Sequence, residues 1–229
     1  MNKTLLALGA HYDDCVFGVP GIMLQAVRKH YRVVILTLIG DYTNWAPAKG
    51  RSQEIVQGTI DISREYGVEM RYLDFRSHEF DVVTPAKKVV AAAVADIRPD
   101  IALFLWPHDS HDDHRVASQL CDVALKQGDA LVPDRGARPP RAMYHYDNGP
   151  RHTIGFVPNT FIDVSDDWPQ AIEWLGRFRA LVRGEAYDPK RVEPSQKTKE
   201  AIAAYRGATC GAAYAEALCS LQHHPQDIL

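Results

Sequence analysis

The sequence predicts an α/β protein whose sheet is mostly parallel and carries helices on both faces. Two observations support this prediction. The strongly apolar runs, such as residues 32–39, are continuous rather than alternating, which is typical of strands covered on both sides. Segments with helical spacing separate these runs, and strands that alternate with helices are typical of a parallel sheet with helical crossovers.

Each expected strand and helix of the first half has a local signal. The strands are short apolar runs, of which the second is rich in β-branched side chains and the third is more polar. The second helix ends at Gly67, and the third has Pro85 in its first turn and stops before Pro99. The expected order is strand 4–8, helix 16–30, strand 32–39, helix 51–66, strand 69–75, helix 85–97, strand 101–106 and helix 113–126.

The second half is expected to complete a single domain over residues 1–229. Residues 128–140 are rich in Gly, Pro and Arg and predict an exposed connection. Residues 190–229 predict a C-terminal extension of loop and helices that packs on the core. The other expected elements are strands at residues 142–146 and 160–164 and a helix at residues 168–182.

Composition and charge limit the classes of function. With 229 residues and 46% hydrophobic content, the chain is long enough and apolar enough to bury a substantial core. A net charge of −3 gives no reason to expect nucleic acid or an anionic membrane as a partner. No stretch approaches the ~18 consecutive apolar residues of a membrane span. The N-terminus lacks a signal-peptide pattern, and the four cysteines lack the spacing of a structural zinc site, so we expect a cytoplasmic enzyme with reduced thiols.

Histidines and aspartates gather at two places along the chain. The run Ala10-His11-Tyr12-Asp13-Asp14 ends the first apolar segment, and the run His108-Asp109-Ser110-His111-Asp112-Asp113-His114 follows the fourth predicted strand. In Rossmann-like sheets of the predicted kind, ligands bind outside the carboxyl ends of the strands. Because both runs lie at such ends, we expect them to meet in one crevice and to form a metal site there.

The first run contains two adjacent carboxylates with different expected directions. If the chain turns as in a helix, His11 and Asp14 share a face because they are three residues apart, so they can hold one ion together. Asp13 then points beside the ion, where a carboxylate can take a proton from metal-bound water. An alternative is that an aspartate merely caps the following helix. One cap, however, explains neither His11 nor the second carboxylate.

The second run offers the remaining ligand. His111 and His114 are also three residues apart, so one can bind the ion while the other faces the substrate, and His108 is a third candidate. The spacing alone does not distinguish them. Together with His11 and Asp14, one of these histidines completes a ligand set that leaves positions open for water and substrate, as in catalytic rather than structural zinc sites.

Two other chemistries fit these residues less well. Two histidines and one carboxylate also form the facial triad of non-haem iron(II) enzymes. A second carboxylate beside the ligands favours hydrolysis instead, since an oxygenase needs no neighbouring base. The glycines after the first strand, Gly9, Gly18 and Gly21, do not have the spacing of a dinucleotide-binding turn, and this turn is acidic where a pyrophosphate would lie.

At these residues the chain resembles the LmbE-like zinc deacetylases, also called the PIG-L family. The hallmark of the family is Ala-His-Pro-Asp-Asp-Glu after the first strand and a later His-x-Asp-His. The corresponding runs here are Ala10-His11-Tyr12-Asp13-Asp14-Cys15 and His111-Asp112-Asp113-His114. Further similarity lies in the pair Arg51 and Glu54, in the run Tyr214-Ala215-Glu216 and in residues 159–163, so the resemblance touches most of the chain.

The resemblance implies roles for the residues of the two runs. His11, Asp14 and His114 would hold one Zn²⁺ per chain, and other divalent ions such as Fe²⁺ are compatible with the same ligands. Asp13 would be the general base. His111 would face the substrate and, when protonated, stabilise the oxyanion that forms during the reaction.

Four residues are expected to contact the substrate. By resemblance Arg51 and Glu54 would lie beside the pocket, and the aromatic rings of Tyr12 and Trp45 would line its mouth. Tyr12 replaces the proline of the family and Cys15 replaces its glutamate. Neither position is an expected metal ligand, so these departures bear on the choice of substrate more than on the reaction.

The resemblance implies removal of an acyl group, in typical members acetyl, from the amide nitrogen of an N-acetylglucosamine-type amino sugar or its conjugate. The partner would be this small molecule, and relatives often form homo-oligomers. Two alternatives stay open at this point: hydrolysis of a non-sugar amide on the same scaffold, or metal-dependent binding without catalysis.

Overall fold

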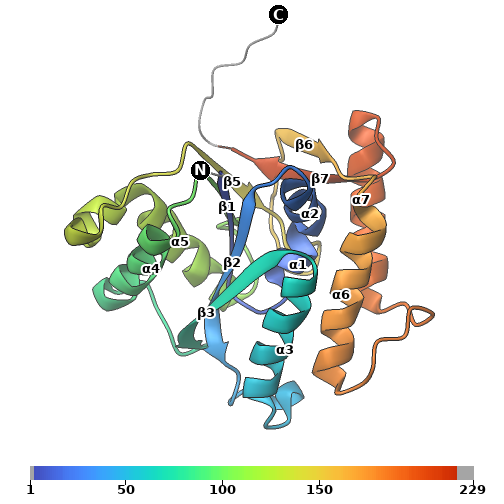
Figure 1. Cartoon of the computed structure of the whole chain (residues 1–229), viewed down its shortest axis with the longest axis horizontal. Coiled ribbons are helices and arrows are strands. Elements are labelled where there is room, and N and C mark those ends of the chain that lie inside the picture. Colours follow the sequence, from blue (N-terminus) through green and yellow to red (C-terminus); the bar gives the residue numbers. More distant parts are fainter. Residues whose placement is uncertain (1–2, 221–229) are drawn as a thin grey trace, which may run out of the picture.

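A sheet of seven strands runs through the computed structural model, which describes residues 3–220 (Figure 1). The strands are β1 (Thr4–Gly9), β2 (Arg32–Asp41), β3 (Val68–Arg76), β4 (Ile101–Leu105), β5 (Ala142–Tyr146), β6 (Thr160–Asp163) and β7 (Ala215–Cys219). Within the described residues their order is β3-β2-β1-β4-β5-β7-β6. The first five strands pair in parallel, whereas β7 is antiparallel to both of its neighbours, β5 and β6.

This arrangement confirms the predicted α/β fold with a mostly parallel sheet. β1 is buried along its whole length and β2 along residues 33–39, which explains why their sequences are continuous apolar runs. β1 lies between β2 and β4. The strand order therefore reverses at this point: β2 and β3 extend the sheet on one side of β1, and β4 begins the other side. Such a switch point opens a crevice at the carboxyl ends of the strands.

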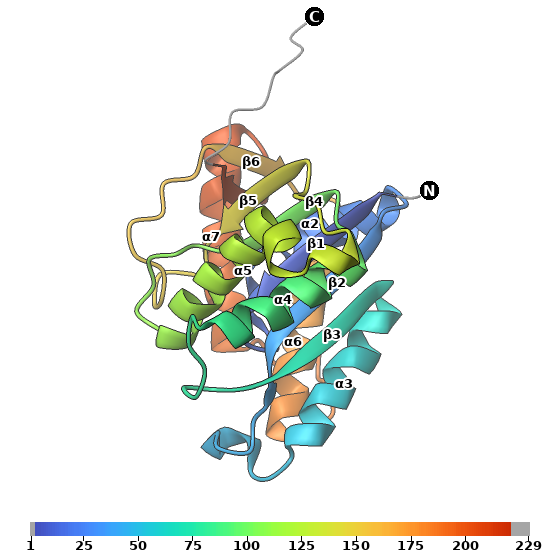
Figure 2. The same ribbon diagram turned by 90° about the vertical axis from the view of Figure 1, so that its left-hand side faces the viewer.

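Helices cover both faces of the sheet, as predicted. They are α1 (Asp14–Gly18), α2 (Pro20–Arg28), α3 (Ser52–Glu65), α4 (Thr84–Ile97), α5 (Asp112–Leu131), α6 (Trp168–Arg183) and α7 (Pro194–Cys210), with short 3-10 turns at Ala46–Ala48 and Pro133–Arg135. Figures 1 and 2 show α4 and α5 on one face and the other helices on the opposite face. None of the helices within residues 3–220 combines the length and the apolar composition that a membrane span needs.

Two helices differ from their predicted bounds. The segment expected as one helix over residues 16–30 is broken between α1 and α2 at Val19, whose φ of −139° and ψ of 38° are not helical. Pro20 follows this residue and disfavours a helical conformation before it, which explains the break. α5 continues to Leu131, so residues 128–131 belong to the helix rather than to the predicted connection.

The C-terminal region differs most from the sequence-based expectation. The sequence predicts only loop and helices after residue 190, whereas β7 is a fully buried strand between β5 and β6. Its sequence, Ala-Glu-Ala-Leu-Cys, has no β-branched side chain, so the buried slot in the sheet decides its conformation against its local preference. Residues 221–229 of the predicted extension lie outside the described residues, and the single-domain organisation stays a prediction.

A buried ion pair joins the C-terminal region to the helices that follow β1. The Glu216 carboxylate of β7 accepts hydrogen bonds from the backbone N–H groups of Gly21 (3.1 Å) and Ile22 (2.9 Å), so it caps the first turn of α2. Lys199 Nζ of α7 lies 3.0 Å from Glu216 Oε1 and donates a hydrogen bond to the carbonyl of Gly18 (2.8 Å). Their side chains are only 5% and 0% exposed, so neither charge is solvated by water.

Replacing Lys199 with Met should destabilise the protein strongly, because it leaves the Glu216 carboxylate buried without its cation. We expect the free energy of unfolding to fall by about 3–5 kcal/mol in urea denaturation. The matched control is Lys197→Met on the same helix, where the side chain is exposed and the expected change is about 0.5 kcal/mol or less. Equal losses in the two variants would contradict a stabilising role for the buried pair.

Candidate metal centre and active site

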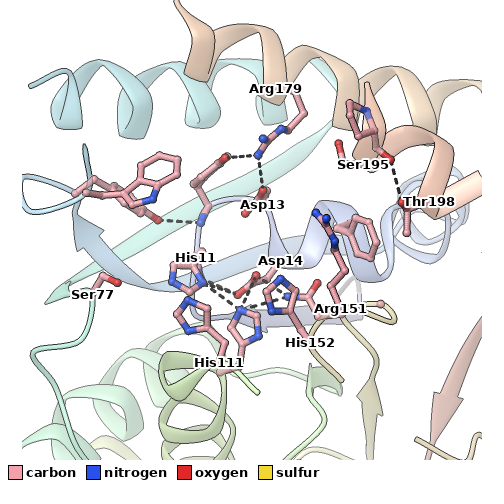
Figure 3. A pocket seen from close by; sticks show the side chains of 18 of the residues that line it. His11, Asp13, Asp14, Ser77, His111, Arg151, His152, Arg179, Ser195 and Thr198 are labelled. Atoms are coloured by element: carbon pink, nitrogen blue, oxygen red, sulfur yellow. Dashed lines mark hydrogen bonds and ion pairs between the residues drawn. The ribbon is translucent and has the colours of Figure 1, made fainter. Parts of the chain in front are cut away.

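The two histidine and aspartate runs meet at the carboxyl ends of β1 and β4. These strands are direct neighbours, with Leu8 of β1 paired to Phe104 of β4. The first run forms the turn from β1 into α1, and the second forms the loop and first turn that lead from β4 into α5. Their side chains line a cavity of about 740 Å³ at this edge of the sheet (Figure 3).

Three donor groups form a candidate metal group, which consists of His11, Asp14 and His114. His11 Nδ1 lies 3.2 Å from His114 Nε2, and Asp14 Oδ1 lies 3.3 Å from the same Nε2. His11 Nδ1 lies 3.6 Å from the other oxygen of the same carboxylate, Asp14 Oδ2. A tetrahedral Zn²⁺ with ligand distances of about 2.0–2.1 Å holds its ligand atoms about 3.3 Å apart. The donor set and its spacing therefore fit a divalent ion.

Each histidine of the metal group is oriented by a buried carboxylate at its other ring nitrogen. His11 Nε2 lies 3.0 Å from Asp113 Oδ2, and His114 Nδ1 lies 3.1 Å from Asp109 Oδ2. A metal-binding histidine commonly uses its second nitrogen in this way, which fixes the ring and the tautomer. The arrangement leaves His11 Nδ1 and His114 Nε2 directed at the same point, where an ion can bind.

The carboxylate of the metal group is also held from several sides. Asp14 Oδ2 accepts hydrogen bonds from the backbone N–H groups of Ala10 (2.8 Å) and His11 (2.7 Å), and Asp14 Oδ1 accepts one from Asn148 Nδ2 (2.7 Å). Asn148 lies in the loop after β5, which carries no recognisable motif. Asp113 is held in turn by the hydroxyl of Ser77 (2.6 Å) and the backbone N–H of His78 (2.8 Å).

The electrostatic surroundings of the metal group favour a positive charge in it. Burial lowers the pKa of His11, but Asp14 and Asp113 outweigh this effect and raise it to about 9. Burial acts in the same direction on His114, and Asp14 and Asp109 raise its pKa to about 10. Protons on these rings balance the buried carboxylates. A divalent ion can replace those protons.

Asp13 is separate from the metal group and has different surroundings. Its Oδ2 lies 3.4 Å from Nη1 of Arg179 in α6, and the same Nη1 donates a hydrogen bond to the hydroxyl of Tyr12 (3.0 Å). Burial and the neighbouring Asp14 raise the pKa of Asp13 against the opposing effect of Arg179. A carboxylate with a raised pKa beside an ion site is suited to accept a proton. The sequence does not predict Arg179, because nothing in its local pattern marks it.

His111 lines the cavity but stays outside the metal group. Its ring centroid lies 4.9 Å from that of His11 and 4.8 Å from that of His114. Burial and these two neighbouring histidines lower the pKa of His111 to about 4. Without a bound ion, the surroundings of His111 therefore favour its neutral form, and its role toward the substrate stays a prediction. A neutral imidazole can still donate one N–H hydrogen bond.

His108, the third candidate ligand, is exposed and does not belong to the metal group.

Two of the four expected substrate contacts lie at the cavity. The rings of Tyr12 and Trp45 both line it, with their centroids 5.9 Å apart. Tyr12 is only 3% exposed, so little of its ring is accessible to a ligand. Cys15, which stands where the family has glutamate, is buried with its Sγ 3.4 Å from the hydroxyl of Tyr146, and all four cysteines are free.

Arg51 and Glu54 do not line the cavity, so the expectation for these two residues is corrected. Arg51 Nη1 donates to the carbonyl of Leu181 (3.2 Å), and Nη2 donates to that of Val182, both in the last turn of α6. Glu54 pairs with the same guanidinium at 3.0 Å. A cation at the carboxyl end of a helix satisfies carbonyl groups that lack partners within the helix. The role of the pair in this structure is therefore to join α3 to α6.

Comparisons with known proteins agree with the fold and identify the family. The sequence matches the PIG-L family, described as GlcNAc-PI de-N-acetylase, over residues 6–125. It is 26% identical over 232 residues to diacetylchitobiose deacetylase of Thermococcus kodakarensis, covering 94% of this chain and 82% of that protein. In fold it is similar to the conserved protein TT1542 of Thermus thermophilus, with 23% identity, a TM-score of 0.79 and coverage of 99% and 98% of the two chains. It is also similar to GalB, the 4-carboxy-2-hydroxymuconate hydratase of Pseudomonas putida, with 17% identity, a TM-score of 0.79 and 99% coverage of each chain.

The segment that matches the family, residues 6–125, is more than half of the chain and contains both runs. The protein therefore belongs to the PIG-L, or LmbE-like, family.

Proposed function

We propose that this protein is a metal-dependent hydrolase that removes an acetyl group from the nitrogen of an N-acetylglucosamine-type amino sugar or its conjugate. The observation that carries the proposal is the convergence of His11, Asp14 and His114 in a cavity that also contains the separate carboxylate of Asp13. Membership of a de-N-acetylase family and the activity of the Thermococcus relative support an acetylated amino sugar as the substrate.

Zn²⁺ is the ion that we propose for the metal group. Two imidazoles and one carboxylate are a common catalytic donor set for this ion, and the spacing of the donors suits tetrahedral ligation. Fe²⁺ is an alternative that accepts the same ligands. When bound, the ion supplies a Lewis acid and lowers the pKa of a water ligand to about 7.

The side chains around the metal group have distinct tasks in the proposed reaction. Asp13 accepts the proton of the water that attacks the amide carbonyl, while Arg179 holds the carboxylate in place. The N–H of neutral His111 donates a hydrogen bond to the carbonyl oxygen as it gains negative charge. Asp13 then returns its proton to the departing amine. Tyr12 and Trp45 form an apolar wall for the sugar ring.

Metal binding should depend on His11. In His11→Ala, we expect Zn²⁺ affinity to fall by more than about 100-fold, because the loss of a ligand exceeds the 10- to 100-fold effect of removing an outer partner. Titration calorimetry of the chelator-treated protein measures this affinity. His108→Ala is the matched control and should bind one ion per chain with unchanged affinity, since this exposed side chain lies outside the metal group. Unchanged binding by His11→Ala would remove the proposed ion site.

The reaction itself is tested with a panel of acetylated compounds. Zinc-loaded protein is incubated with N-acetylglucosamine, its disaccharide and its glycosides, and with N-acetyl amino acids as the non-sugar alternative. We expect equal amounts of acetate and free amine from an amino sugar. Cleavage of N-acetyl amino acids alone would favour the non-sugar hydrolase, and zinc binding without any cleavage would favour a binding protein. Since GalB shares the fold, addition of water to 4-carboxy-2-hydroxymuconate is measured as well.

Asp13→Asn should abolish most of the activity without loss of the ion. An amide cannot accept the proton of the attacking water, so we expect kcat to fall by about 10²- to 10⁴-fold. Acetate release measures the rate, and the zinc content of the same sample confirms that the metal group is intact. Asp112→Asn is the control and should retain wild-type activity, because Asp112 is an exposed member of the second run that does not line the cavity and pairs with Arg115. Near wild-type turnover by Asp13→Asn would overturn its assignment as the base.

A further inference from the structure

The side-chain amide of Asn148 lies against two of the three donor atoms of the metal group. Its Nδ2 is 2.7 Å from Asp14 Oδ1 and 3.4 Å from His114 Nε2. These two donor atoms are themselves 3.3 Å apart. By triangulation from the three distances, an ion bound about 2.0–2.1 Å from both donor atoms lies no more than about 4 Å from Nδ2, whichever side of the pair it occupies. The amide is therefore a direct neighbour of the ion position.

The loop after β5 holds this amide in place. The backbone N–H of Asn148 donates a hydrogen bond to Thr153 Oγ1 (2.8 Å), and the backbone N–H of Ile154 donates one to the carbonyl of His108 (2.9 Å). The second of these bonds attaches the loop to the run that carries His114. Asn148 is only 8% exposed and lines the cavity. Its side chain therefore approaches the metal group from a fixed position, as the ligands do.

The two ends of the amide are used unequally. Nδ2 donates to Asp14, whereas Oδ1 accepts no hydrogen bond from any residue within 3–220. Half a turn about the Cβ–Cγ bond exchanges these two atoms, which occupy nearly the same volume, and breaks only the bond to Asp14. Beside a divalent cation the carbonyl oxygen is attracted, because it is the negative end of the amide dipole, whereas the NH₂ group is repelled. An ion in the metal group therefore favours the turned amide.

From this geometry we infer that Asn148 is a fourth protein ligand of the ion, which it binds through Oδ1 after the amide has turned. The inference rests on the proposed function for the presence of an ion in the metal group. After the turn, Oδ1 takes the place of Nδ2 beside Asp14 Oδ1 and His114 Nε2. The distances there, 2.7 and 3.4 Å, lie on either side of the spacing of about 3.3 Å between the ligand atoms of a tetrahedral zinc ion. Two oxygen acceptors this close repel each other unless a cation binds both, so the turn follows ion binding.

An amide oxygen suits this site chemically. Asparagine oxygens are ligands of hard divalent ions, and Zn²⁺ accepts oxygen ligands as well as imidazole. Zinc in catalytic sites also accepts five ligands, so a fourth protein ligand still leaves a place for water. Because the amide is neutral, it adds a ligand without cancelling any charge of the ion. The positive charge that lowers the pKa of a water ligand is thereby retained.

A crystal structure of the zinc-loaded protein tests the contact directly. We expect the terminal atom of Asn148 at about 2.0–2.2 Å from the ion, the usual distance of an oxygen ligand. The distance itself identifies this atom as Oδ1, since the amide nitrogen has no free electron pair for a metal. A separation of more than about 3 Å between the ion and both terminal atoms would overturn the inference.

Metal affinity tests the same contact in solution. Titration calorimetry of the chelator-treated protein should show that Asn148→Ala binds Zn²⁺ at least about tenfold more weakly, because an oxygen ligand is lost. Asn148→Asp has the same shape and retains the oxygen, so we expect an affinity equal to or higher than that of the wild type. Asn159→Ala is the control and should bind with unchanged affinity, since this exposed asparagine lies outside the cavity and donates to the carbonyl of Ser220.

The two variants of Asn148 together separate a ligand from a hydrogen-bond donor. A donor that only holds Asp14 is lost in both variants, so both would bind zinc more weakly and to a similar extent. That result, or an unchanged affinity of Asn148→Ala, would overturn the assignment. Circular dichroism establishes that each variant is folded before titration, and the crystal structure of the wild type depends on no variant.

These measurements need no substrate, so they separate the inference from the proposed reaction. Ligation of zinc by Asn148 without acetate release from any compound of the panel would retain the ligand and reject the deacetylase. Acetate release by a protein whose ion lies beyond the reach of Asn148 would do the reverse. Absence of zinc binding by the wild type would reject both.

Discussion

The fold buries several carboxylates at the ends of two adjacent strands, and the rest of the site depends on how this negative charge is balanced. Asp14, Asp109 and Asp113 are only 2–4% exposed. An ionised carboxylate in such a position is costly unless it is paired and hydrogen-bonded. The imidazoles of His11 and His114 provide the pairing, and backbone N–H groups of the turn after β1 provide hydrogen bonds. The same network that makes this turn stable therefore also prepares a site for a cation.

The ligands of this site could be predicted because they depend on short-range sequence. The ends of two buried strands determine where the runs lie, and a spacing of three residues determines which side chains face the same point. The grouping of His11 with Asp14 and the separate position of Asp13 follow from these two rules, whereas the choice of His114 among the later histidines rests on the family resemblance. The fold was predictable for a similar reason, since continuous apolar runs between helical segments leave few alternatives to a covered parallel sheet.

The residues that could not be predicted reach the site from distant segments. Arg179 comes from α6 and Asn148 from the loop after β5, and neither has a local pattern that distinguishes it from an ordinary surface side chain. Arg51 shows the converse: the sequence identifies a cation at the start of a helix but does not show that the end of α6 packs beside it. β7 also depends on tertiary context, because the space between β5 and β6 selects the conformation of a segment with weak strand preference.

The cap on α2 has a consequence for folding during synthesis. Glu216 accepts the hydrogen bond of Gly21 from a position 195 residues further along the chain. At ribosomal speeds of about 5–20 residues per second, the start of α2 is synthesised roughly 10–40 s before this carboxylate. The turn that carries His11 and Asp14 leads directly into these helices. The N-terminal cap of α2 is therefore completed only after β7 has been synthesised, although the helix itself lies near the start of the chain.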